Sequence, residues 1–92
     1  MKQVTYEDVR KTLVAARLPV RRKNASGPHE DPELVLTARA NGILVTVEQR
    51  FGSVPTPASN ALTSQASIVV MDAGMIIEVN EWDRFTVVGW TS

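Results

Sequence analysis

Apolar residues near the N-terminus recur at helical spacing. Thr5 is a suitable N-cap, and Asp8 three residues later takes the place of the usual glutamate of a capping box. Pro19 cannot continue a helix, so the pattern predicts one over residues 5–17. The apolar positions, three or four residues apart, form a single stripe and are Tyr6, Val9, Leu13 and Ala16.

Two alternating segments, Leu34–Ala40 and Ile43–Phe51, flank the dipeptide Asn41-Gly42. This dipeptide favours a two-residue hairpin turn because both residues tolerate positive φ. With that turn, apolar pairs alternate with mostly polar ones, and a slip by one residue would destroy the separation. The pattern therefore predicts an antiparallel hairpin in which the apolar pairs are Ala40 with Ile43, Ala38 with Val45 and Leu36 with Val47.

The segment 52–65 is small, polar and interrupted by proline. Thr56 followed by Pro57 is a legitimate helix start, because proline suits the first helical position. A short helix over residues 57–63 and an ordered loop both remain open as interpretations. A loop of this length without its own structure is often functional or mobile.

Three further segments near the C-terminus are rich in β-branched residues. Ser67–Met71 and Met75–Asn80 are predicted strands joined by a three-residue loop, Asp72–Gly74, with glycine in the left-handed position. Both segments are apolar on two faces, which is typical of central strands. After a turn over residues 80–83, Arg84–Trp90 is predicted to be the last strand.

These elements predict one α+β domain over residues 1–92. The N-terminal helix would pack on a curled antiparallel sheet of four to five strands, arranged as a hairpin meander. One helix cannot cover every apolar strand position, so either the sheet curls toward a barrel or its second face is buried in an oligomer. The face expected to receive the helix is formed by Leu36, Ala38, Val45 and Val47.

Charge is sorted along the chain, although its formal total is zero. Residues 1–23 contain seven basic and two acidic residues, a balance of +5. Residues 24–92 contain three basic and eight acidic residues, a balance of −5. The two parts therefore either neutralise each other on folding or present surfaces of opposite charge to different partners.

The composition argues against an enzyme. Cysteine is absent, which excludes disulfides, thiolate zinc sites and iron–sulfur clusters. His29 is the only histidine, and its acidic neighbours in the same loop rarely converge on one ion. No glycine-rich phosphate loop is present among the five scattered glycines. We therefore expect no catalytic activity, no metal and no cofactor.

The sequence also lacks an apolar leader segment and any apolar run approaching the roughly 20 residues that span a bilayer. These features, together with the absence of cysteine, predict a cytoplasmic protein without membrane contact.

Trp82 is the strongest candidate for a partner contact, because it lies in a predicted turn between Glu81 and Asp83. Tryptophan is enriched at interface hot spots, and acidic neighbours could form a rim. Trp90 is a further candidate, with packing inside the sheet as its alternative role. We therefore expect a protein–protein interaction module, an assembly component or an inhibitor of a protein target, that binds or self-associates through an apolar sheet face or a strand edge. A phage origin is suggested only by the class of small cysteine-free proteins.

A basic cluster formed by Arg17, Arg21, Arg22 and Lys23 gives the alternative hypothesis. Four cations near a helix end could bind a phosphate ligand or nucleic acid weakly and with strong salt dependence. Nucleic-acid-binding proteins normally add stacking aromatic residues, and Tyr6 is the only aromatic residue in the basic third. This hypothesis therefore ranks second.

Overall fold

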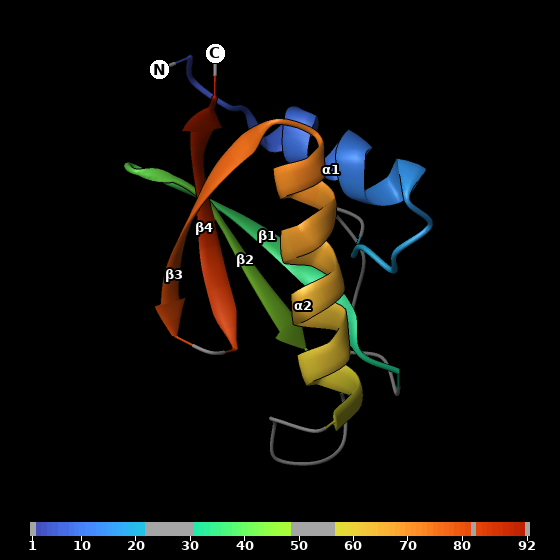
Figure 1. Cartoon of the computed structure of the whole chain (residues 1–92). Coiled ribbons are helices and arrows are strands. Elements are labelled where there is room, and N and C mark those ends of the chain that lie inside the picture. The colour runs from blue at the N-terminus through green and yellow to red at the C-terminus, as the bar shows by residue number, and fades with distance from the viewer. Residues whose placement is uncertain (1, 22–30, 49–56, 82, 92) are drawn as a thin grey trace.

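The computed structural model describes residues 2–21, 31–48, 57–81 and 83–91. It confirms the predicted α+β class, with two helices and a four-stranded antiparallel sheet that remains open (Figure 1). In chain order the elements are α1 (Tyr6–Ala15), β1 (Glu33–Arg39), β2 (Gly42–Glu48), α2 (Pro57–Asp72), β3 (Met75–Glu81) and β4 (Arg84–Trp90).

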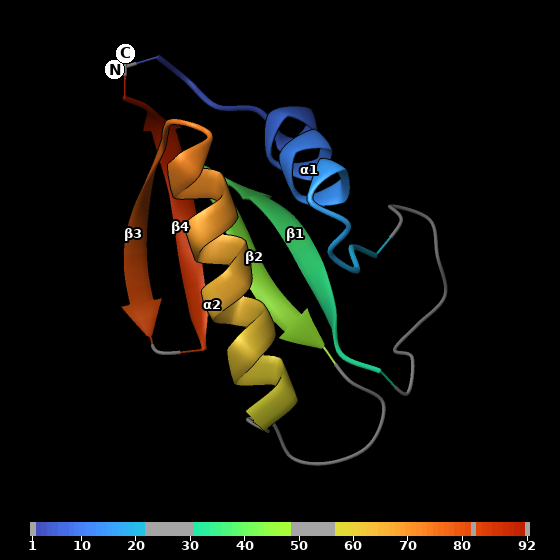
Figure 2. The ribbon, with the colours of Figure 1, turned by 45° about the vertical axis from the view of Figure 1, so that its right-hand side comes forward.

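The strands are arranged in the order β1-β2-β4-β3, and every neighbouring pair is antiparallel. Helix α2 carries the chain from β2 to β3, so these two strands run parallel with β4 between them. This order differs from the predicted hairpin meander and places β3 at an edge, where a central strand had been expected. Both helices cover the same face of the sheet (Figure 2).

The predicted start of α1 is confirmed in detail. The backbone N–H of Asp8 donates to Thr5 Oγ1 at 3.2 Å, and the Thr5 N–H donates to Asp8 Oδ2 at 3.0 Å. This reciprocal pair is a capping box. Val9 and Leu13 are buried as the stripe predicts, and Tyr6 is half-buried.

The end of α1 lies two residues before the predicted one. Arg17 adopts a left-handed φ of 62°, and its N–H donates to the carbonyl of Val14 at 2.9 Å. The Leu18 N–H donates to the carbonyl of Leu13 at 3.2 Å. These two bonds form a Schellman motif, which ends the helix before Pro19 is reached. Ala16, predicted on the apolar stripe, is exposed.

The predicted hairpin forms, but its register is shifted by two residues. Arg39 pairs with Gly42 and Ala38 with Ile43, so the turn residues are Ala40 and Asn41. The expected register was wrong because Gly42 belongs to β2, with φ 145°. A shift by two keeps every side chain on its predicted face.

The predicted strand over Ser67–Met71 was wrong. Of the predicted loop Asp72–Gly74, Asp72 belongs to the helix, whereas Ala73 and Gly74 form a turn with Gly74 at the expected positive φ, 95°. Helix α2 begins at Pro57, as the Thr56-Pro57 signal suggested, and continues to Asp72. β-Branched residues at positions 68–70 favour a strand locally, but packing of one helical face against the sheet overrides this preference. The buried residues of α2 recur at helical spacing and are Ser59, Leu62, Thr63, Ala66 and Val70.

The core lies between the sheet and the two helices. Of the face expected to receive the helix, Leu36 and Val45 are buried, Val47 is half-buried and Ala38 is exposed at the end of β1. Helix α2 contacts all four strands, whereas α1 contacts β1 and α2. The second helix therefore covers the apolar strand positions that a single helix could not.

Candidate interaction grooves

The two edge strands of the sheet, β1 and β3, have backbone N–H and C=O groups that point away from the neighbouring strand. Leu34 on β1 donates its N–H to the Pro19 carbonyl and accepts from the Arg21 N–H, both at 2.8 Å. These groups therefore face away from β2. Because hydrogen bonding alternates along antiparallel strands, the backbone groups of Leu36 and Ala38 also point outward.

The same alternation determines the opposite edge of the sheet. The pairing is regular from Val45 through Phe85 to Val79 and from Ile43 through Val87 to Ile77. Phe85 and Val87 hydrogen-bond to β2, so they form non-hydrogen-bonded pairs with Val79 and Ile77 on their other side. The backbone groups of Ile77 and Val79 therefore point away from β4. Both edges thus offer donors and acceptors to a further strand.

A hollow of about 380 Å³ borders the open edge of β3. We call it the β3 groove. Two residues of β4, Arg84 and the buried Phe85, line it. The walls are formed by Ser64, Ser67 and Met71 of α2 and by Ile77, Val79 and Glu81 of β3.

Apolar side chains are exposed on the elements that form the β3 groove. Of the large hydrophobic residues that the structure describes, four are exposed, and three of these lie on α2 and β3. Val79 is 66% exposed, Ile68 54% and Met71 46%. Exposed apolar side chains beside an open strand edge are typical of an interaction surface.

The surroundings of the β3 groove are acidic. Asp72, Glu78 and Glu81 are exposed, and Asp83 pairs with Arg84 through Nε and Oδ1 at 3.2 Å. The hydrogen bond from Arg84 lowers the pKa of Asp83, and the same contact raises the pKa of Arg84. These four acids and one arginine sum to a net charge of −3; Glu81 and Arg84 line the groove itself, and Glu78 lies on the helix-free face of β3.

The structure brings together only part of the predicted tryptophan site. Glu81 lines the β3 groove and Asp83 lies beyond the end of β3, whereas Trp82 falls outside the described residues. Trp90 lies at the other end of β4, half-buried against the core. The backbone N–H of Trp90 donates to the backbone carbonyl of Lys2 at 2.9 Å. A binding role for Trp82 or Trp90 stays a prediction.

Two of the four residues of the predicted basic cluster, Arg17 and Arg21, lie in the part of the chain that the structure describes. Arg21 Nε contacts Glu33 Oε1 at 2.8 Å, and its Nη1 contacts Glu48 Oε2 at 2.6 Å. The hydrogen bond to Glu33 is the main cause of the raised pKa of Arg21. Arg17 is exposed at the end of α1, and Arg22 and Lys23 lie outside the described residues. Arg21 is therefore already committed to carboxylates.

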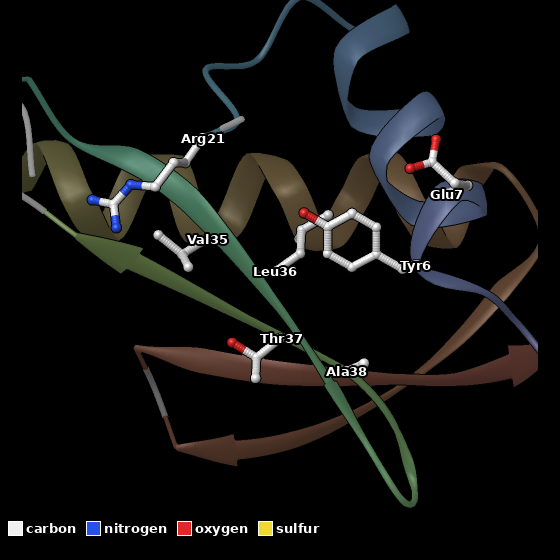
Figure 3. A pocket seen from close by; sticks show the side chains of 7 residues that line it. All are labelled: Tyr6, Glu7, Arg21, Val35, Leu36, Thr37 and Ala38. Carbon is white, nitrogen blue, oxygen red and sulfur yellow. The ribbon is translucent and has the colours of Figure 1, made fainter. Parts of the chain in front are cut away.

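A second hollow, of about 450 Å³, borders the edge of β1 (Figure 3). We call it the β1 groove. The Tyr6 ring lies over β1 at one end, and Arg21 lies beside Val35 at the other. The Pro19–Arg21 segment covers the edge at Leu34, and among the described residues no other backbone segment pairs with this edge from Leu36 onward.

Sequence reasoning missed the β3 groove because residues 67–71 were assigned to a strand. The signal that could have revealed it is the four-residue spacing of Leu62, Ala66 and Val70, which marks the buried face of α2. Recognising that helix would have placed Ser67 and Met71 on its flank.

The described residues contain no group of three or more histidine, aspartate or glutamate side chains suited to a metal ion. His29 lies outside them. None of the described helices combines the length and apolar character needed to cross a bilayer. A scan against protein-family models, a search of curated proteins and a search of solved structures each found no match.

Proposed function

We propose that this protein is a non-enzymatic protein–protein interaction module that binds an extended segment of its partner along the edge of β3. The observation that carries this proposal is the open backbone edge of β3 beside an apolar groove. An added strand would exchange main-chain hydrogen bonds with Ile77 and Val79, and its alternate side chains would enter the groove under α2. Such a module would serve as an assembly component or as an inhibitor of a protein target.

The β3 edge has more support than the helix-free face of the sheet. The apolar residues on that face are half-buried: Val35, Leu44 and Ile76. Val79 at the edge is mostly exposed and gains more from being covered. Trp82, next to Glu81 in sequence, remains the proposed aromatic anchor.

The phosphate-binding alternative has less support, because Arg21 is paired with two glutamates. We also propose that the interaction module is cytoplasmic, as its cysteine-free sequence led us to expect.

Val79→Lys tests the proposed function, because it places a charge on the apolar edge without disturbing the core. The control is Ala58→Lys, which makes the same change at an exposed position at the start of α2. A partner captured by the wild-type protein should be retained by the control and lose at least about tenfold in affinity for Val79→Lys. Equal affinity for both variants, with unchanged circular dichroism and Tm, would contradict binding at this edge.

A further inference from the structure

The two open edges of this sheet carry complementary features, and this inference rests on the proposed use of the β3 edge. We infer that the partner strand is β1 of a second copy, which pairs antiparallel with β3 and continues the sheet from one molecule into the next. The β3 groove would receive the exposed end of β1, and the β1 groove would lie beside the new contact.

The backbone groups of the two edges match. Ala38 on β1 and Val79 on β3 both direct their N–H and C=O outward, so they can form a hydrogen-bonded antiparallel pair. Their side chains both lie on the helix-covered face of the sheet, which keeps the helices of the two copies on one face. The neighbouring pair in this register is Arg39 with Glu78.

That neighbouring pair is opposite in charge and exposed on both strands. Arg39 and Glu78 each lie on the helix-free face, directly across the proposed contact. Oppositely charged residues facing each other across antiparallel strands stabilise the pair, and like charges destabilise it. In this register Ala38 and Val79 form backbone hydrogen bonds, and the neighbouring residues Arg39 and Glu78 form an ion pair.

Charge also argues against the symmetric alternative. A two-fold contact between two β3 edges that pairs Ile77 with Val79 would place Glu78 of one copy opposite Glu78 of the other. On the β1 side of the molecule, Glu7 and Asp8 balance Arg10 and Lys11 of α1, and Arg39 is the exposed cation of β1. Pairing β3 with β1 instead places Glu78 opposite Arg39, and this local complementarity favours a head-to-tail contact.

The helical flanks offer matching surfaces. Ser64 and Ser67 are small, and Met71 is exposed beside them, so a neighbouring helix can approach α2 closely. On α1 of the second copy, Val14 is 46% exposed, and Tyr6 lines the β1 groove. A contact between two different surfaces leaves one β1 and one β3 edge open in every pair, so association continues into a ring or a filament.

The test uses the full chain, with one variant that blocks each edge. Val79→Lys leaves the β1 edge intact, and Ala38→Glu leaves the β3 edge intact. Both positions are exposed, so both variants should fold, which circular dichroism would verify. Wild-type mass should rise with concentration in light scattering and sedimentation velocity. Each variant alone should stay monomeric, and an equimolar mixture should form one-to-one dimers and nothing larger.

Two results would overturn this inference. One is a wild-type protein that stays monomeric from micromolar to millimolar concentration. The other is Ala38→Glu alone forming dimers, since that variant keeps only the β3 edge and would show symmetric pairing.

Charge exchange between Arg39 and Glu78 tests the register. Arg39→Glu and Glu78→Arg should each weaken self-association about two- to fivefold, and the double variant should recover most of that loss. Added salt should weaken wild-type association as well. A double variant weaker than either single variant would contradict this pairing.

The outcomes also separate this inference from the proposed function. A monomeric wild-type protein whose captured partner is lost on Val79→Lys would reject self-association and keep the β3 edge as a binding site. Self-association unchanged by Val79→Lys would reject the inference alone, and a captured partner that Val79→Lys also retains would reject the proposed function.

Discussion

Arg17 carries a local cost in the backbone, because it is the only described non-glycine residue with a positive φ. The left-handed region brings the Cβ of an L-residue close to its carbonyl oxygen and costs roughly 1–2 kcal/mol. Glycine is the usual residue at this position of a Schellman motif. Arg17 is exposed and is held there by the bonds that end α1.

Arg17→Gly should therefore stabilise the protein by roughly 0.5–1 kcal/mol, after the extra unfolded-state entropy of glycine is subtracted. Chemical denaturation would measure the change. Arg17→Ala is the matched control, since alanine keeps the Cβ and should change stability little. A lower stability for Arg17→Gly than for Arg17→Ala would show that φ at this position is not costly.

At the scale of elements, α1 depends on its capping box. The backbone hydrogen bond from Thr5 is the main cause of the lowered pKa of Asp8, followed by the bond to the Thr5 side chain; the Trp90 side chain adds a smaller effect in the same direction. A carboxylate at a helix start also interacts favourably with the helix dipole. The cap thus connects the charge of one side chain to the stability of the whole helix.

Because the pKa of Asp8 is below its ordinary value of 3.8 in the folded protein, protonation favours the unfolded state. Its contribution is present above pH 3.8 and is lost as the pH falls through the folded pKa. Asp8→Asn should therefore be less stable than wild type at neutral pH, and this difference should shrink below pH 3.8. Thr5→Ala should cost about 1 kcal/mol at neutral pH. A pH-independent difference for Asp8→Asn would contradict this role.

At the scale of the whole molecule, Gly42 is where the β1–β2 hairpin meets the β3–β4 hairpin. A Cβ at this position would lie 2.2 Å from the carbonyl oxygen of Val87, and φ is 145°. Only glycine allows β2 to approach β4 this closely. Gly42, predicted as a turn residue, instead allows the two hairpins to share one sheet.

Gly42→Ala should destabilise the fold by roughly 3 kcal/mol or more, because a backbone clash adds to the strain of a positive φ. Gly74→Ala is the matched control: φ there is 95°, but the nearest atom to an added Cβ is Thr91 Oγ1 at 3.7 Å. It should cost about 1 kcal/mol. Thermal and denaturant unfolding would compare the two, and equal losses would show that strain alone, and not the approach of the strands, decides.

The sequence by itself determined the features that depend on neighbouring residues. The Thr5–Asp8 capping box, the buried stripe of α1, the existence of a β1–β2 hairpin and the bounds of β4 all follow from local spacing and hydrogen bonding. The face of each hairpin residue was also predictable, since a shift by two residues preserves it. The acidic character near Glu81 was visible as well.

Tertiary structure decided what depends on distant parts of the chain. Residues 67–71 have strand propensity, but they belong to α2, because a helix buries Ala66 and Val70 on the same face against the sheet. The hairpin register followed the approach of Gly42 to Val87 and not the preference of Asn41-Gly42. Once α2 carried the chain across β4, β3 became an edge with a groove beside it. Local patterns do not predict this strand order. The free energy that selects it comes from burying apolar surface between elements that are far apart in sequence.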